Sequence, residues 1–235
     1  MKKIAIFVEG QTEQLFVERL ITEIANANDI VIAKRKLTGG NRSVPQWIRI
    51  WTSASGPGRI CFILIIDCTG FTTVKSDIRD NYQSLVSEGY SIIIGIRDVY
   101  PEFNHVEIAK LRSKLNYSLR TVPIQVVFIL GVMEIETWFI CEHTHFGRVN
   151  PALTTARIKA GLGFDPAVDD IQLRAIPSDD LDKIYQLVGQ RYQKDYSNIQ
   201  VLLNQLDYTF LYCDVRNRLP DFNVLVESID TFLSP

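Results

Sequence analysis

The sequence predicts an α/β fold, with a mainly parallel sheet flanked by helices and a mostly helical C-terminal part. Short runs of β-branched and aromatic residues alternate with amphipathic segments along residues 3–131. This alternation is typical of parallel strands joined by crossover helices. Beyond residue 132 the segments with a clear period are helical. A composition of 46% hydrophobic and 22% charged residues is that of an ordinary globular protein.

The expected elements follow one another in order. Strand signals are short apolar runs, found at 3–8, 29–37, 59–67, 90–96 and 123–131. Helix signals are found at 12–27, 44–54, 71–89 and 106–119. Thr12 is expected to cap the first helix, Pro45 lies in the first turn of the second, and Gly89 is expected to end the third. The run at 59–67 is the most continuously apolar, so we expect it near the centre of the sheet.

The chain is expected to divide into a core and an extension. Residues 1–132 carry the strand–helix alternation, and residues 133–235 form a mainly helical extension that packs on this core. Helices are expected within 133–143 and 150–170, and over 179–193 and 221–234. There is no Pro- or Ser-rich linker, so one continuous domain remains an alternative.

Charge and composition exclude several classes of protein. The net charge of -2 gives no global basic field. The four cysteines form no C-x-x-C pair, and no signal peptide is apparent, so we expect a cytoplasmic protein with reduced thiols. No apolar run approaches about 20 residues, which argues against a membrane partner. There is neither a complete P-loop nor a Gly-x-Ser-x-Gly nucleophile elbow.

Acidic residues follow four of the five predicted strands. They are Glu9, Asp67, Asp98, Glu134 and Glu136. The carboxyl ends of parallel strands lie at one edge of a sheet, and clustered carboxylates are tolerated there if a cation neutralises them. Oxygen ligands without histidine or cysteine favour Mg²⁺ or Mn²⁺, which support phosphodiester cleavage. The simpler alternative is that strand ends reach solvent and carry charge for that reason.

Two motifs resemble the Toprim fold shared by topoisomerases, primases and several bacterial nucleases. "VEGQTE" (8–13) places Glu9 where that family has a glutamate after its first strand. "IIDCTG" (65–70) matches the family's D-x-D motif at Asp67 and Gly70, with Thr69 in place of the second aspartate. "GVMEIETWFICE" (131–142) looks like the Glu-x-Glu block of nuclease-type relatives. These include the overcoming-lysogenization-defect nucleases and small Toprim-like proteins found beside ATPases in phage-defence loci, whose C-terminal parts residues 178–194 and 216–229 also resemble.

The resemblance implies a role for each matching residue. Glu9 becomes a metal ligand or general acid/base and Asp67 a principal metal ligand, and both are catalytic residues. Glu13 becomes a further ligand, one helical turn after Glu9. Glu134 and Glu136, with Asp98, would complete the site, and Lys194 would assist the phosphate. Thr69 leaves open whether one metal or two are bound.

A basic stretch precedes the third predicted strand. Its cations are Lys34, Arg35, Lys36 and Arg42. We expect them to follow a nucleic-acid backbone, although a solvated strand end and loop would have the same composition.

Together these features predict a Mg²⁺- or Mn²⁺-dependent nuclease acting on DNA or RNA, as the effector of a phage-defence system. One alternative is a catalytically eroded Toprim-like module that binds nucleic acid or an ATPase partner without cleaving. A receiver- or flavodoxin-type domain is disfavoured, because the fifth strand leads into two glutamates instead of a lysine. The sequence leaves homo-oligomerisation open.

Overall fold

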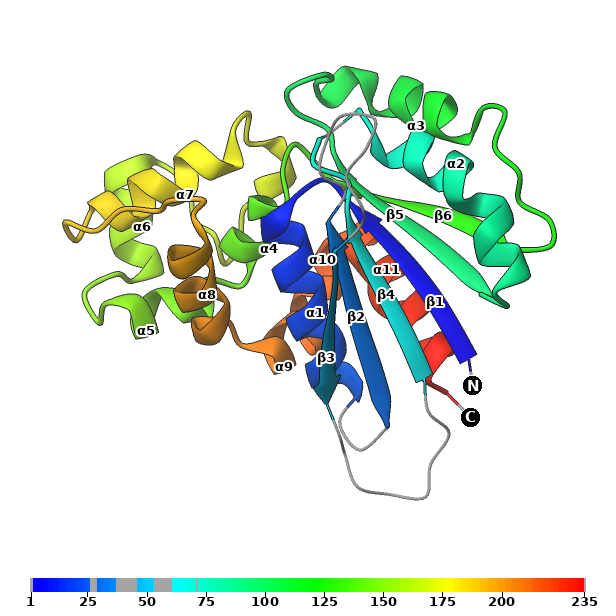
Figure 1. Ribbon diagram of the computed structural model, residues 1–235. Helices are drawn as coiled ribbons and strands as arrows, with labels where there is room; N and C mark the ends of the chain where they lie inside the picture. Colours follow the sequence, from blue (N-terminus) through cyan, green and yellow to red (C-terminus); the bar gives the residue numbers. More distant parts are fainter. Residues whose placement is uncertain (1, 26–28, 37–45, 53–60, 71, 235) are drawn as a thin grey trace. The chain divides into compact units, whose positions relative to one another are not determined.

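The computed structural model describes residues 2–25, 29–36, 46–52, 61–70 and 72–234, with the backbone alone for 46–52. The chain forms two compact units (Figure 1). The first unit comprises Met1–Arg97, Lys110–Ile129 and Leu225–Pro235, and the second comprises Asp98–Ala109 and Leu130–Val224. The change of unit at 129/130 lies close to the boundary expected at 132, whereas the last eleven residues belong to the first unit.

A six-stranded sheet has the order β3-β2-β4-β1-β5-β6. The strands are β1 (Lys2–Val8), β2 (Ile30–Lys36), β3 (Gln46–Thr52), β4 (Cys61–Asp67), β5 (Ile92–Asp98) and β6 (Gln125–Gly131). β1 runs parallel to β4 and β5, and β2 runs parallel to β4. The apolar strand β4 lies inside the sheet, between β2 and β1. The predicted α/β fold with a mainly parallel sheet is therefore confirmed.

The helix expected over 44–54 is wrong. Residues 46–52 form β3, which pairs with β2 in antiparallel register from Ile30↔Thr52 to Lys36↔Gln46. The sequence QWIRIWT alternates aromatic and β-branched residues with polar ones, and this period of two suits a strand. Pro45 in a first turn is a weaker signal than that alternation.

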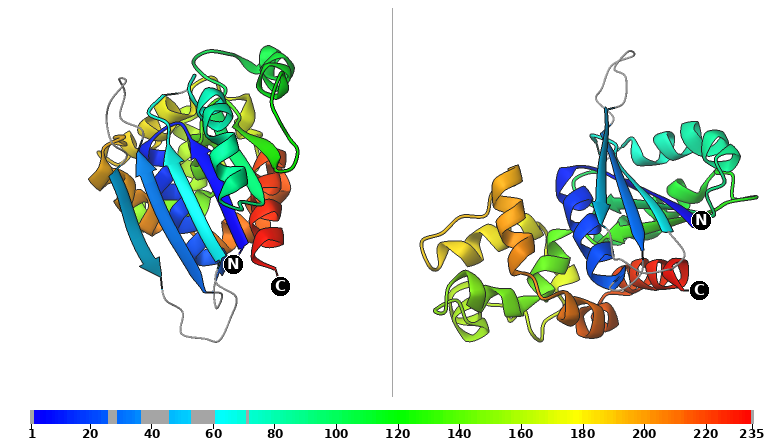
Figure 2. Two further views of the ribbon diagram at one scale, coloured as in Figure 1. Left: turned by 45° about the vertical axis from the view of Figure 1, so that its right-hand side comes forward. Right: turned by 60° about the horizontal axis from the view of Figure 1, so that its bottom comes forward.

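Helices cover both faces of the sheet in the first unit (Figure 2). On one face, α1 (Gln11–Ala25) packs against β2 and β4. On the other, α2 (Val74–Ser87) packs against β1, and its Ile78 and Leu85 share a core cluster with Phe7 and Leu64. α3 (Ile108–Asn116) leads into β6. Successive residues of a strand point to opposite faces of the sheet, and helices cover both faces. Each parallel strand can therefore be apolar along its whole length.

The second unit is mainly helical. Its helices are α4 (Glu136–Cys141), α5 (Phe146–Val149), α6 (Thr155–Leu162), α7 (Pro177–Gln186), α8 (Tyr196–Gln205), α9 (Tyr208–Phe210), α10 (Arg216–Arg218) and the start of α11 (Pro220–Leu233). Trp138 packs on Phe222 with ring centroids 5.1 Å apart. None of the helices that the structure describes is long and apolar enough to cross a membrane.

Two helix predictions in this part differ from the structure. The helix expected over 179–193 ends at Gln186, because Gly189 adopts a left-handed φ of 75° that an α-helix cannot include. α8 was not among the expected elements. Asp195 caps it by accepting a hydrogen bond from the backbone N–H of Asn198 at 3.1 Å.

Candidate functional site

Backbone pairing brings Glu9 and Asp67 together in the first unit. Asp67 is the register partner of Val8 across β1 and β4, so Glu9 follows immediately beside it. The loop after β4 then bonds to the same stretch of β1. The N–H of Cys68 donates to the Val8 carbonyl and that of Gly70 to the Glu9 carbonyl, both at 2.9 Å. The first two predicted strand-end acids therefore share one edge of the sheet.

Glu13 faces back toward this edge from the first turn of α1. Its side chain is buried, and a Cβ added to Gly10 would lie 3.3 Å from Glu13 Oε2. A residue larger than glycine at position 10 would therefore press on this carboxylate. Three of the predicted ligands therefore belong to the first unit. Glu9 and Glu13 lie in and after the connection from β1 to α1, and Asp67 ends the neighbouring strand β4.

Two basic side chains form ion pairs with these carboxylates. Lys36 Nζ is 3.7 Å from Asp67 Oδ2, and Arg97 Nε is 3.7 Å from Glu9 Oε1. Asp67 is only 2% exposed. Burial raises the pKa of Asp67, although the Thr69 N–H and Lys36 oppose that rise. The charge on Asp67 is therefore only partly compensated by the protein itself.

Thr69 stands where the resemblance implies a second aspartate. It adopts a left-handed backbone with φ 53°, and its N–H donates to Asp67 Oδ1 at 2.8 Å. The next turn is fixed by Thr73, whose hydroxyl donates to the carbonyl of Gly70 at 2.8 Å. Thr69 thus orients the Asp67 carboxylate through its backbone N–H. Any residue type other than proline could donate this hydrogen bond, so the identity of residue 69 does not predict it.

Sequence reasoning missed one acidic residue near this loop. Asp77 lies in the first turn of α2, beside the thiol of Cys68 and the hydroxyl of Thr73. Burial raises the pKa of Asp77, and hydrogen bonds from Cys68 and Thr73 oppose that rise. The sequence feature that could have indicated Asp77 is its position in the first turn of the helix that follows the loop at residues 67–70.

In the second unit, Glu134 is held by the N-terminus of α7. Its Oε2 accepts the backbone N–H of Ser178 at 2.7 Å, and its Oε1 accepts the Ser178 hydroxyl at 3.0 Å. A helix N-terminus presents donors and partial positive charge, which suit a carboxylate. Both oxygens of Glu134 are therefore engaged by the protein.

Glu136 anchors Lys194. The Glu136 side chain is completely buried, and its Oε1 accepts the Tyr192 hydroxyl at 2.7 Å and lies 2.9 Å from Lys194 Nζ. Its Oε2 is buried and has no hydrogen-bond partner within the described parts of the chain. Burial alone would lower the pKa of Lys194, but the charges of Glu136 and Glu134 outweigh burial and raise it. Lys194 therefore stays protonated at neutral pH, with its side chain 46% exposed.

Asp98, at the end of β5, belongs to the same cluster. It is buried, and its charge contributes to the raised pKa of Lys194. A Cβ added to Gly131 would lie 2.3 Å from Asp98 Oδ1 and 3.0 Å from the Ile135 nitrogen. Glycine at the end of β6 is thus required for this carboxylate to fit. The second unit brings together Asp98, Glu134, Glu136 and Lys194.

The predicted nucleic-acid-binding residues have different surroundings. Lys34 is largely buried and forms an ion pair with Glu18 at 2.6 Å. The Arg35 side chain is half-buried in β2, and Lys36 is 52% exposed beside Asp67. Arg42 lies outside the described residues. Lys36 is the member of this set whose position best suits a phosphate near the carboxylates.

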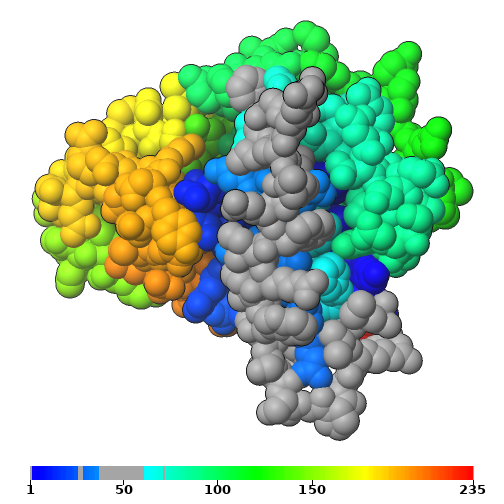
Figure 3. All heavy atoms as spheres, in the orientation of Figure 1, coloured from blue at the N-terminus to red at the C-terminus, as the bar shows by residue number. Residues whose placement is uncertain are grey.

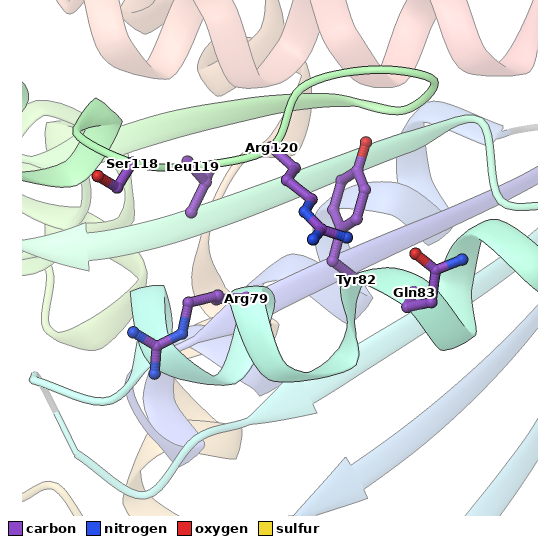
Figure 4. Close-up of a pocket in the computed structure, with 6 residues that line it drawn as sticks. All are labelled: Arg79, Tyr82, Gln83, Ser118, Leu119 and Arg120. Atoms are coloured by element: carbon purple, nitrogen blue, oxygen red, sulfur yellow. The ribbon is translucent and has the colours of Figure 1, made fainter.

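A pocket of about 300 Å³ lies elsewhere in the first unit (Figure 4). Its lining residues are Arg79, Tyr82, Gln83, Ser118, Leu119 and Arg120. Arg79 pairs with Asp80 at 3.1 Å, and its guanidinium points away from Arg120 (Figure 4). The Tyr82 hydroxyl donates to the Ile124 carbonyl at 3.0 Å. These polar groups do not converge on a common point, so we do not assign a ligand to this pocket.

The donors at the strand-end edge match a hard divalent cation in chemistry. Glu9, Glu13 and Asp67 offer only carboxylate oxygens, the ligands that Mg²⁺ and Mn²⁺ prefer. Among the described residues, however, no group of three or more His, Cys, Asp or Glu side chains is positioned to hold a metal ion. In their present arrangement Lys36 and Arg97 supply the positive charge beside Asp67 and Glu9.

Comparisons of this chain with protein-family models, with curated proteins and with solved structures found no match.

Proposed function

We propose that this protein is a divalent-metal-dependent nuclease of the Toprim type, hydrolysing phosphodiester bonds of DNA or RNA. The observation that carries the proposal is the edge formed by Glu9, Glu13 and Asp67. Backbone pairing sets Asp67 beside the end of β1, and burial raises its pKa. A buried carboxylate whose pKa is raised by burial is stabilised by a divalent ion that neutralises its charge.

Each residue of the proposed site has a defined task. Glu9, Glu13 and Asp67 would hold Mg²⁺ or Mn²⁺, which when bound supplies an activated water and stabilises the leaving oxygen. Thr69 keeps the Asp67 carboxylate oriented through its N–H. Lys194 belongs to the second unit, where Glu136 holds it protonated, and we propose that it assists a phosphate there as a separate group. The resemblance to Toprim-like proteins beside ATPases supports an effector role in phage defence with an ATPase partner.

A second candidate is a module that binds nucleic acid or an ATPase partner without cleaving. The observation in its favour is that the described residues contain no ready-made metal-ligand group. Thr69 replaces a second acid, and the carboxylates lie beside Lys36 and Arg97. The protein would then have a Toprim-like fold but bind no catalytic metal, and it would not cleave the nucleic acid that it binds.

Nicking of supercoiled plasmid and cleavage of single-stranded RNA, each with Mg²⁺ or Mn²⁺, test the first candidate. We expect wild type to cleave at least one substrate, and Glu9→Gln and Asp67→Asn to lose about 100-fold or more of that activity. Asp80→Asn is the matched control, because Asp80 is an exposed acid that pairs with Arg79 on α2. Activity that survives both site variants would refute the catalytic assignment. No cleavage by wild type, together with no rise in melting temperature on adding metal, would favour the second candidate.

A further inference from the structure

A basic surface lies in the first unit, where α2 and the end of α3 are adjacent. Figure 3 shows the blue-green atoms of α2 and the green atoms of α3 next to each other on the right of the view. Residues 110–124 contain no Asp or Glu. The cations from both elements, which we call the α2–α3 basic surface, are Lys75, Arg79, Lys110, Arg112, Lys114 and Arg120.

Lys75 holds the two elements together. Its Nζ donates to the carbonyls of Lys114 and Tyr117 at 2.6 and 2.7 Å. These carbonyls belong to the last turn of α3 and to the residue after it, where a helix has unsatisfied acceptors and partial negative charge. Lys75 therefore fixes the end of α3 beside the start of α2, and the cations of both elements are held next to one another.

The charges of this surface oppose one another. Burial and, after it, the positive charges of Arg79 and Lys114 lower the pKa of Lys75. Arg79 pairs with Asp80 at 3.1 Å, and its side chain is 65% exposed. The four cations within residues 110–120 are also exposed. Like charges held close together on an exposed surface are stabilised by a polyanion that neutralises several of them at once.

The arrangement of the cations suits an extended ligand. Arg79 from α2 and Arg120 from the segment after α3 both line the pocket of Figure 4, which has no acid among its described lining residues. Their polar groups do not converge, which argues against a small anion held at one point. Cations spread over a surface contact successive charges of a polymer instead.

The surface begins beside the loop that carries Asp67. The Thr73 hydroxyl donates to the Gly70 carbonyl of that loop at 2.8 Å, and α2 starts at the next residue. Lys75 is therefore only two residues beyond the group that fixes the loop. A polyanion bound along α2 and α3 would lead toward the edge formed by Glu9 and Asp67. This position favours nucleic acid, the substrate of the proposed function, over an acidic protein segment.

The basic stretch that the sequence analysis selected is less suited to this task. Lys34 is largely buried and pairs with Glu18 at 2.6 Å, and the Arg35 side chain is half-buried. The cations at residues 110–120 are exposed and follow one another without an intervening acid.

We propose that the α2–α3 basic surface binds the phosphate backbone of nucleic acid. The inference rests on the proposed function for the identity of the polyanion, and it adds where the protein holds its substrate. Phosphate contacts are electrostatic and carry no sequence information. Binding here should therefore depend strongly on salt and be the same for unrelated sequences.

Fluorescence anisotropy in EDTA, which prevents cleavage, tests the proposal with a labelled duplex and a labelled single strand of about 20 nucleotides. We expect wild type to bind at least one of them. The double variant Lys114→Gln/Arg120→Gln should bind about five- to twentyfold more weakly at about 50 mM salt. The slope of log affinity against log salt concentration should become shallower by about 1.4 for the single strand or about 1.8 for the duplex, the values for two lost phosphate contacts.

Lys159→Gln is the matched control. Lys114 and Lys159 are both exposed lysines in the last turn of a helix, so the two changes should affect helix stability equally. Affinity and salt slope should be unchanged in Lys159→Gln. The double variant should keep the melting temperature of wild type, because both of its altered side chains are exposed.

Three results would overturn the proposal: no binding by wild type, an equal loss of affinity in Lys159→Gln, or an unchanged salt slope in the double variant. A labelled polyglutamate peptide of equal length provides a further test. If it bound wild type as tightly as nucleic acid does and lost affinity in the double variant, the proposal would be wrong, because the surface would then fit an acidic protein segment.

The failure of this inference is distinguishable from failure of the proposed function. Binding that depends on the α2–α3 basic surface, without metal-dependent cleavage, would refute the nuclease alone. Cleavage that is lost in Asp67→Asn, with nucleic-acid binding insensitive to Lys114→Gln/Arg120→Gln, would refute the role of the surface alone.

Discussion

The carboxylates of the two units are buried to a similar extent but are held in opposite ways. In the second unit, Glu136 accepts a hydroxyl at 2.7 Å and has an ammonium group 2.9 Å away. In the first, Asp67 accepts the Thr69 N–H at 2.8 Å and is 3.7 Å from Lys36 Nζ. Glu136 is already stabilised by a nearby ammonium group, whereas burial raises the pKa of Asp67, so an added cation would stabilise the Asp67 carboxylate further.

This difference predicts a structural role for the carboxylates of the second unit and a functional role for Asp67. Glu134 and Glu136 fix α7 and Lys194, so their removal should damage the fold of the second unit. Burial raises the pKa of Asp67, so we expect its ionised carboxylate to lower the stability of the metal-free protein, and its removal to damage function alone. The following variants test that division.

The largest expected effect is on the second unit, in Glu136→Ala. This change leaves the Tyr192 hydroxyl and Lys194 without their shared acceptor. Breaking a buried pair costs about 3–5 kcal/mol, which we reduce to about 2–3 kcal/mol because Lys194 is 46% exposed. Urea denaturation measures the free energy of unfolding. Glu136→Gln, which keeps an acceptor for Tyr192, should lose about half as much; equal stability of Glu136→Ala and wild type would contradict the anchoring role.

Gly131→Ala should have the next largest effect. The new Cβ would lie 2.3 Å from Asp98 Oδ1 and 3.0 Å from the backbone nitrogen of Ile135, so the backbone or the carboxylate must move. We expect a loss of about 1–3 kcal/mol in thermal or urea unfolding. Gly147→Ala is the control, because its Cβ would have no neighbour within 4 Å and its position is helical. If the two alanine variants were equally stable, the claim that a Cβ at position 131 does not fit beside Asp98 would be wrong.

Asp67→Asn should act in the opposite direction. In EDTA, the neutral amide removes a desolvated charge while keeping an oxygen to accept the Thr69 N–H. We expect the melting temperature to rise by about 2–4 °C, which corresponds to about 1 kcal/mol for a chain of this length. We expect Mn²⁺ to raise the melting temperature of wild type, and this rise should be absent in Asp67→Asn. A metal-free Asp67→Asn that melts below wild type would show that this carboxylate is structural.

The smallest expected effect is a pH-dependent one at Asp195. The backbone N–H of Asn198 and the Asn198 amide lower the pKa of this α8 cap. A carboxyl whose pKa is lowered by folding stabilises the protein above its usual range, and that contribution is lost as the pH falls through the lowered folded value. Asp195→Ala should therefore melt slightly below wild type at neutral pH, and the difference should shrink in acid. A difference that is the same at both pH values would show that the charge on Asp195 does not contribute.

The strand ends of the first unit were predictable from sequence, because local patterns determine them. Short apolar runs indicate the parallel strands, and parallel strands place residues such as Glu9 and Asp67 at one edge. The sequence predicts a helix where β3 forms, because a proline at the start of a segment can also begin a helix. Its alternating residues were the better guide.

The partners of the second-unit acids were not predictable in the same way. Ser178 lies 44 residues from Glu134, and Tyr192 lies 56 residues from Glu136, with several helices and loops between them. No sequence period links such positions. The resemblance alone points to Lys194, and its ion pair with Glu136 depends on the tertiary contact between α4 and the segment before α8.

Anomalous diffraction from a crystal soaked in Mn²⁺ tests the central claim most directly. We predict a manganese peak within about 2.0–2.6 Å of carboxylate oxygens of Glu9 and Asp67, the range of direct metal–oxygen bonds. We also predict that Lys36 and Arg97 withdraw from these oxygens, since the ion replaces their charge. A crystal without manganese at this edge, with Lys36 and Arg97 still beside Asp67 and Glu9, would contradict the claim.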